Sequence, residues 1–192
     1  MLKDLIYLAG FYLNLTDVTD YLTAIDGDED VSDLTEPKEM ETLISLSNLV
    51  IRNVTRKYIP LYFEEVKQSN ENCEINFSNF SKSVNEIKSV ISSDGLKATF
   101  RVFPEYIKVG NPNSSYKIVY SYIPSEIRTL NSSLVLPVGI SEDDLVFGVC
   151  SEFATMNMLY DEADMFESKF KECLLKSLMG KSERKFKSRS FI

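Results

Sequence analysis

The side chains that could carry out chemistry in this chain of 192 residues are carboxylates, lysines, tyrosines and three cysteines, because histidine is absent. Without histidine, a Ser-His-Asp triad, a Cys-His dyad and a histidine zinc site are all excluded. Cys73, Cys150 and Cys173 lie far apart and form no C-x-x-C pair, so the sequence predicts neither a disulfide framework nor a thiolate metal cluster. We expect the three cysteines to be small buried apolar residues.

Adjacent acidic residues are the remaining candidates for acid–base chemistry, and they occur as Glu64-Glu65, Asp143-Asp144 and Asp161-Glu162. Neighbours on a helix point about 100° apart, so we expect these pairs to be solvated or to cap helices. The sequence contains no glycine-rich phosphate loop and no G-x-S-x-G motif. We therefore name no catalytic residue, no cofactor and no metal site, and we predict that the chain is not an enzyme.

An acidic stretch from Asp26 to Glu36 resembles a calcium loop at first sight. Asp26, Asp28 and Asp30 fall at positions 1, 3 and 5 of an EF-hand pattern, but Val31 replaces the glycine and Pro37 replaces the bidentate glutamate. A solvated connection between helices fits the stretch better. One functional hypothesis that stays open is a carboxylate–metal nuclease that uses these three aspartates.

Charge is unevenly distributed along the chain. The net charge is −8, yet residues 181–192 carry five bases and one acid, so the other 180 residues carry −12. An acidic protein repels a phosphodiester backbone and is a poor candidate for gripping nucleic acid. The basic segment also contains Phe186 and Phe191, which gain nothing from water but would gain about 1.5 to 3 kcal/mol each by burial in a partner. This composition favours folding upon binding to an acidic groove, although a frayed, solvated end is an equal alternative.

The elements that must position these residues begin with helices. Apolar residues recur at helical spacing over residues 2–14, 40–58 and 145–174. Pro60 requires the second helix to end by Ile59. Ser141 and Asp144 predict a capped start for the last stretch, which fits one long helix or a pair of helices divided near Asp161. Its large apolar side chains are predicted to be core: Phe153, Met156, Met158, Phe166 and Phe170.

The hydrophobic period changes from 3.6 to 2 between Cys73 and Pro137, and β-branched and aromatic residues are enriched there. Turns are expected at Asp94-Gly95 and at residues 110–113. The sequence therefore predicts a small antiparallel β-sheet. Apolar stretches are interrupted by charge before the roughly 18 residues that cross a bilayer, and the start lacks a signal-peptide pattern, so we predict a protein made in the cytoplasm, with no membrane partner.

Together these patterns predict an α+β fold of amphipathic helices with a small antiparallel β-sheet insertion and an extended C-terminal tail. The predicted segments are the N-terminal helices (1–72), the β-rich insertion (73–138), the C-terminal helical part (139–180) and the basic C-terminal tail (181–192).

The ordered set of segments resembles a known family. LVFGVCSEFATMNMLYDEADMFESKFKECLLKSL and the basic tail behind it are similar to the C-terminal half of head-to-tail adaptor (connector) proteins of tailed bacteriophages. LKDLIYLAGFYLNL, RKYIPL, INFSNFSKSVNEIKSV, GLKATFRVFPEYIKV and YKIVYSYIPSEI resemble the same family, in the same order. The usage of Asn, Ser and Lys is also similar to that of AT-rich phages such as the crAss-like group, whose corresponding component is called a ring protein.

The resemblance implies that the helices form an antiparallel α-helical bundle that carries the β-sheet insertion. It also implies a structural virion protein at the neck, forming a ring beneath the portal, typically a dodecamer, and joining the portal to the tail. The implied partners are the portal protein, adjacent tail or neck ring proteins and copies of the chain itself, while DNA passes through the channel without specific binding. The resemblance assigns portal binding to the tail, whose relevant residues are Arg184, Lys185, Phe186, Lys187, Arg189 and Phe191. Family members often have a tryptophan in this tail, which this chain lacks. The alternative function is a phage nucleic-acid-binding or packaging accessory protein that uses the same tail.

Overall fold

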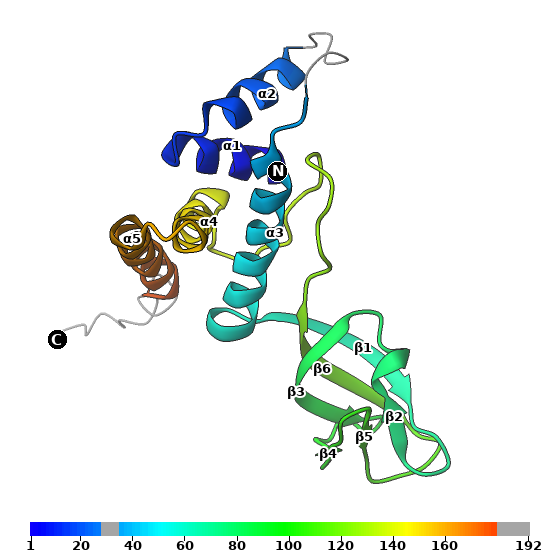
Figure 1. The fold of residues 1–192 in the computed structure, drawn as a ribbon. Helices are drawn as coiled ribbons and strands as arrows, with labels where there is room; N and C mark the ends of the chain where they lie inside the picture. Colours follow the sequence, from blue (N-terminus) through cyan, green and yellow to red (C-terminus); the bar gives the residue numbers. More distant parts are fainter. Residues whose placement is uncertain (28–34, 180–192) are drawn as a thin grey trace, which may run out of the picture. The chain divides into compact units, whose positions relative to one another are not determined.

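A computed structural model of the chain describes residues 1–27 and 35–179, which fold into two compact units. The helical unit comprises residues up to Ile51 and from Glu126 onward, and the β-rich unit comprises Arg52–Ser125. Figure 1 shows the helices of the first unit and the strands of the second. The predicted C-terminal tail lies outside the described residues.

The helical unit is built from amphipathic helices whose apolar faces pack against one another. Leu5, Ile6, Leu43 and Val149 are among the residues buried by this packing. The most extensive helix–helix contacts are those of α4 with α5, α1 with α4, and α1 with α2. The bounds of the helices are α1 Leu2–Tyr12, α2 Thr16–Asp26, α3 Lys38–Asn53, α4 Glu142–Met156 and α5 Tyr160–Met179.

Local sequence explains where these helices end. Asn14 adopts a positive φ of 55°, a conformation that asparagine tolerates better than most residues, and it separates α1 from α2. After α3, the chain makes a π-helical turn at Val54–Tyr58 and leaves the helical conformation at Ile59, next to Pro60. The predicted stop before Pro60 is therefore confirmed. Within the described ranges, no helix combines the length and apolarity needed to cross a membrane.

The β-rich unit contains two three-stranded antiparallel sheets, ordered β1-β6-β3 and β2-β5-β4. The β1–β6 ladder runs without a register shift, whereas β3 pairs with β6 through two irregularities. Nine residues, including Ile75, Ile107 and Tyr120, form one buried cluster between the sheets. The bounds of the strands are β1 Leu61–Gln68, β2 Glu74–Asn76, β3 Ser83–Ser92, β4 Arg101–Val102, β5 Tyr106–Lys108 and β6 Ser115–Ile123.

The predicted antiparallel helical bundle with one small sheet is wrong, although an α+β class is compatible with the structure. Figure 1 shows α3 running across the direction of α1 instead of alongside it, and the strands form two sheets instead of one. The physical reason is that a hydrophobic period identifies which face of a helix is buried but not its partner or crossing angle. Helix α2 and strand β1 were also not predicted.

A partly buried hydrogen bond joins two strands of the larger sheet. The Tyr120 hydroxyl on β6 donates to a carboxylate oxygen of Glu65 on β1 at 2.6 Å. Burial disfavours the Glu65 carboxylate, but hydrogen bonds from Tyr120, Lys67 and Ser81 outweigh it and lower the pKa of Glu65. Burial and the Glu65 contact raise the pKa of Tyr120 to about 12. The pair therefore stabilises the sheet while Glu65 is ionised and Tyr120 is neutral.

Replacing Tyr120 by phenylalanine is expected to lower the free energy of unfolding of the β-rich unit by about 1 to 2 kcal/mol at neutral pH, because the carboxylate loses a charge-assisted donor. The loss should shrink as the pH falls below 4.5, the ordinary pKa of glutamate, since the stability from a lowered native pKa is fully present above that value and is lost as the pH falls through the lower native pKa. Urea unfolding followed by circular dichroism at neutral and acidic pH measures both. Tyr122→Phe is the matched control, and an equal effect of the two substitutions would contradict the assignment.

Candidate interaction surfaces

The residues to which the resemblance assigns portal binding are all in the tail. Arg184, Lys185, Phe186, Lys187, Arg189 and Phe191 lie outside the described residues. The described residues include none of these side chains, but they include exposed surfaces, cavities and ionisable groups that could interact with partners.

The hairpin of α4 and α5 starts at a capping box. Asp144 N donates to Ser141 Oγ at 3.3 Å, and Ser141 N donates to the Asp144 carboxylate at 2.8 Å, as the sequence predicts. The last stretch is a helix pair, one of the two arrangements left open by the sequence. The break follows Met156, and Met158 takes a positive φ of 61° that reverses the chain.

The turn between the two helices exposes four large apolar side chains within five consecutive residues, and the remaining residue is Asn157. We call this surface the α4–α5 corner and define it as Met156, Met158, Leu159 and Tyr160. Met156 is 55% exposed, Met158 75% and Tyr160 64%. The prediction that Met156 and Met158 belong to the core is therefore wrong, because the helical period stops at the turn and restarts in α5.

The predicted core positions further along α5 face inward. Ala163 and Phe166 are buried, Phe170 is half-buried, and Ser151 Oγ on α4 donates to the Ala163 carbonyl at 3.1 Å. These contacts fix the start of α5 against α4. The α4–α5 corner is thus held on a packed hairpin instead of on a free loop.

The rim of the α4–α5 corner is acidic. Asp161, Glu162 and Asp164 occupy the first turns of α5 and are exposed. In the described part of the chain, none of the three forms an ion pair. Negative side chains are favourable at a helix N-terminus, which explains why the helix tolerates them there. An apolar surface with an acidic rim suits a partner that is apolar and basic.

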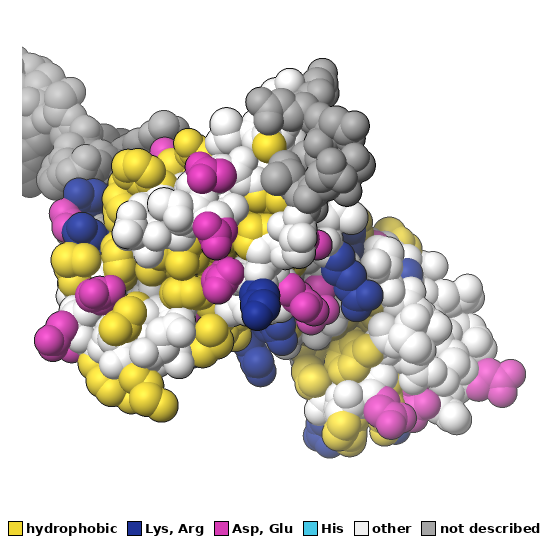
Figure 2. Space-filling model, turned by 45° about the horizontal axis from the view of Figure 1, so that its top comes forward, with side chains coloured by type: hydrophobic (Ala, Val, Ile, Leu, Met, Phe, Trp, Pro, Cys, Tyr) yellow, Lys and Arg dark blue, Asp and Glu magenta, His cyan; other side chains and the backbone are white. Residues whose placement is uncertain are grey.

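Large apolar side chains are exposed elsewhere on the helical unit as well. In Figure 2, hydrophobic side chains lie among acidic and basic ones on the face that the view shows. Phe11 and Tyr12 at the end of α1 are exposed, as are Leu175 on α5 and Val138 before α4. Single exposed apolar side chains are common, so these residues are weaker candidates for an interaction surface than the α4–α5 corner, where four of them lie within five residues.

The β-rich unit also exposes apolar side chains, on its strands and turns. Tyr62 and Val66 project from β1, which pairs on one side only, and Leu96 and Val102 are exposed elsewhere in the unit. An edge strand with exposed apolar residues offers both side chains and backbone groups to a neighbour. This is a second candidate contact surface.

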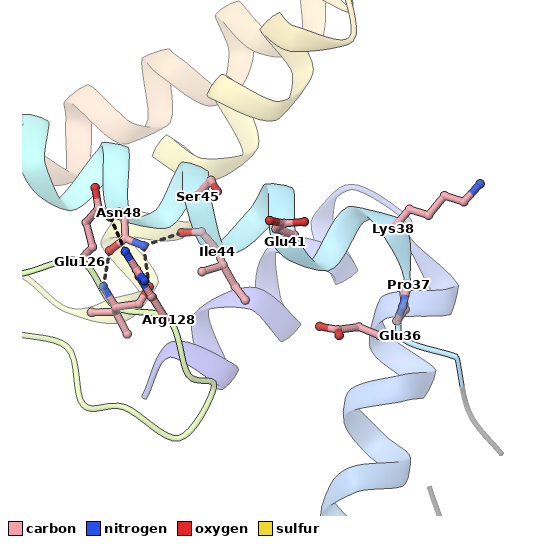
Figure 3. Close-up of a pocket in the computed structure, with 10 residues that line it drawn as sticks. Glu36, Pro37, Lys38, Glu41, Ile44, Ser45, Asn48, Glu126 and Arg128 are labelled. Atoms are coloured by element: carbon pink, nitrogen blue, oxygen red, sulfur yellow. Dashed lines mark hydrogen bonds and ion pairs between the residues drawn. The ribbon is translucent and has the colours of Figure 1, made fainter. Parts of the chain in front are cut away.

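A polar groove lies within the helical unit between the start of α3 and residues 126–128 (Figure 3), and its volume is about 620 Å³. Asn48 holds its two sides together, because its side-chain amide donates to the Ile127 carbonyl at 2.7 Å and accepts from Ile127 N at 2.8 Å. Glu36, Glu41 and Lys38 are among the charged residues that line it. Figure 3 shows Lys38 pointing away from the two glutamates. We assign no reaction to this groove.

The cysteines differ from one another in burial. Cys150 is buried in α4, and this burial raises the pKa of its thiol to about 12. Cys73 and Cys173 are only half-buried, so the prediction of burial is correct for Cys150 alone. Burial, followed by nearby Asp144, raises the pKa of Cys173 as well. Raised thiol pKa values disfavour the thiolate, which is the nucleophilic form.

The paired acids are placed differently from one another. Asp144 caps α4 as predicted, and Glu64 forms an exposed ion pair with Lys117 at 2.7 Å. Glu65 departs from the prediction because it lies on a strand, where adjacent side chains face opposite sides, and it is partly buried against Tyr120. No sequence signal for this strand was recognised, since β1 lacks a simple alternation of apolar and polar residues.

The acidic stretch falls mostly outside the described residues, which include Asp26 but neither Asp28 nor Asp30. Asp26 forms an ion pair with Lys3. Across residues 1–27 and 35–179, no group of three or more Asp, Glu or Cys side chains is arranged to hold a metal ion.

No protein-family model matches this chain, and no curated protein matches it.

Proposed function

We propose that the chain is a structural virion protein, a head-to-tail adaptor whose copies form a ring below the portal and join it to the tail. The observation that carries the proposal is the polarity of charge along the chain. A net charge of −12 on residues 1–180 is followed by +4 on twelve residues that include two phenylalanines. The ordered similarity of segments to phage adaptors supports the same role.

In this proposal the C-terminal tail docks on the portal protein. Lys185, Lys187 and Arg189 pair with acidic groups of the portal, Arg184 adds to this charge, and Phe186 and Phe191 are the apolar anchors. A contact of this kind is modest for one copy. Repeated around a ring it becomes strong, because every tail after the first binds at a high effective concentration.

The acidic body suits passage of DNA through the ring. Phosphate contacts release counterions and would hold the duplex, whereas negative charge leaves it free to slide. The exposed apolar surfaces of both units, the α4–α5 corner and strand β1 among them, are available for contacts between copies and with the next ring of the tail. The role is structural, and no catalytic step is part of it.

The nucleic-acid-binding alternative predicts a different response to salt. We expect the complex of the full-length chain with the portal of the same genome to weaken only modestly with increasing salt, because apolar anchors contribute to it. Binding to duplex DNA is expected to be weak. Fluorescence titrations with the portal and with DNA over a range of salt concentrations measure both. Tight, sequence-independent DNA binding with a steep salt slope would favour the alternative instead.

A further inference from the structure

The α4–α5 corner and the C-terminal segment have complementary chemistry. The corner presents Met156, Met158, Leu159 and Tyr160 to solvent, within a rim formed by three exposed acids of α5. Residues 181–192 carry a net charge of +4 together with Phe186 and Phe191. An apolar surface with an acidic rim is what a basic segment with two phenylalanines would bind.

The length of the helix favours a second copy as the source of the segment. Helix α5 has 20 residues and spans about 30 Å, with the corner at its first residue and the C-terminal segment beyond its last. Phe186 is seven residues past Met179, and even a fully extended chain of that length covers only about 25 Å. A chain could therefore bring Phe186 to its own corner only with the connecting residues fully extended back along the whole of α5. A second copy is not subject to this constraint.

We propose that the α4–α5 corner of one copy receives residues 181–192 of a neighbouring copy. The contact joins two different surfaces of identical chains, so it is head-to-tail, and such a contact generates a ring when its rotation closes. The inference deepens the proposed function and rests on it for the competing site on the portal. One segment cannot be buried in two places, so the neighbouring copy holds the segment in the absence of the portal and releases it when the segment docks on the portal.

The contact is tested by sedimentation of the full-length chain over increasing concentration. We expect reversible self-association that weakens about tenfold or more when the corner is changed by Met158→Asn with Tyr160→Ser, or the tail by Phe186→Ser with Phe191→Ser. Asparagine tolerates the positive φ of residue 158, which keeps the turn intact. Val138→Ser is the matched control, because Val138 is 86% exposed in the same unit but is not part of the corner.

Mixing the two variants gives a sharper result. A corner variant with an intact tail and a tail variant with an intact corner can make one contact with each other but no further one, so the mixture should stop at one-to-one pairs. Full-length chain that stays monomeric at every concentration, or that associates equally well with both sets of substitutions, would overturn the inference.

Measuring how the variants bind the portal distinguishes a failure of this inference from a failure of the proposed function. The corner variant has an unchanged tail and should bind the portal at least as tightly as the natural chain, because a competing site is gone. Weaker portal binding by this variant would overturn the competition. Loss of self-association in a tail variant that still binds the portal fully would instead leave the inference standing and contradict portal docking by the tail.

Discussion

A chain that ends at residue 180 is expected to bind the portal at least a hundredfold more weakly than the full-length chain. Each copy loses the burial of Phe186 and Phe191, about 1.5 to 3 kcal/mol for each side chain, and this loss is multiplied by the number of tails that bind together. The missing residues follow the last described helix, α5, so the comparison requires a folding control. Surface plasmon resonance on immobilised portal, with circular dichroism as the folding control, makes the comparison.

Two substituted tails separate the contributions to this effect. Phe186→Ala with Phe191→Ala keeps the +4 charge and removes the anchors, and we expect it to reproduce most of the loss. Replacement of Lys185, Lys187 and Arg189 by glutamine keeps the anchors and should mainly slow association, with a weaker dependence on salt. Undiminished binding by the truncated chain would remove the tail from the mechanism.

Replacing Gly148 by alanine is expected to destabilise the helical unit by about 1 to 3 kcal/mol, through overpacking. A Cβ atom at this position in α4 would lie 2.8 Å from a methyl group of Val50 on α3 and 3.0 Å from the ring of Phe170 on α5. The sign of this change in the free energy of unfolding distinguishes the two environments, because alanine at an exposed helix position would stabilise the helix by about 1 kcal/mol relative to glycine. Urea unfolding followed at the helical circular dichroism band measures the change.

Gly10 supplies the matched control for this substitution. It also lies inside a buried stretch of helix, α1, but its added Cβ would meet the Val18 and Thr19 side chains at 3.2 and 3.3 Å, so a smaller loss is expected for Gly10→Ala. Adding Val50→Ala to Gly148→Ala removes the closest methyl group and should restore part of the stability, in a double-mutant cycle. A Gly148→Ala chain more stable than the natural one would contradict the observed three-helix contact.

Gly148 also illustrates what the sequence could not reveal. Glycine is interpreted from sequence as a turn or helix end, and here it marks the point where three helices approach closely. The apolar stripe of α3 correctly identified Leu43 and Val50 as buried, because periodicity reports the face of a helix that avoids water. It carries no information on the partner, so the predicted bundle was wrong.

The residue pattern predicts some of the strands but not all of them. Clear alternation over Tyr116–Tyr122 and the apolar residues of 84–91 predicted β6 and β3. The residue pattern does not predict strand β1, because exposed Tyr62 and Val66 on one face oppose half-buried Glu65 and Lys67 on the other, which reverses the usual pattern of an edge strand. The polar side chains of that inner face are satisfied by a tyrosine hydroxyl and an ion pair, and neither can be foreseen from local sequence.

The candidate interaction surface was only partly predictable. The residue pattern allows a break near Asp161, but it also predicts Met156 and Met158 to be core, because their spacing continues a helical stripe. A turn at residues 157–159 shifts that stripe and turns Met156, Met158 and Tyr160 to solvent. The tail residues were identified by charge and aromatic content alone, which are visible in sequence without any knowledge of the fold.

Imaging the portal of the same genome mixed with the full-length chain, by electron cryomicroscopy, tests the proposed adaptor role most directly. We expect a symmetric ring of this chain below the portal, with density for residues 181–192 in clefts of the portal wall. A portal without added density, or a ring whose C-terminal segments are all free of the portal, would contradict the account.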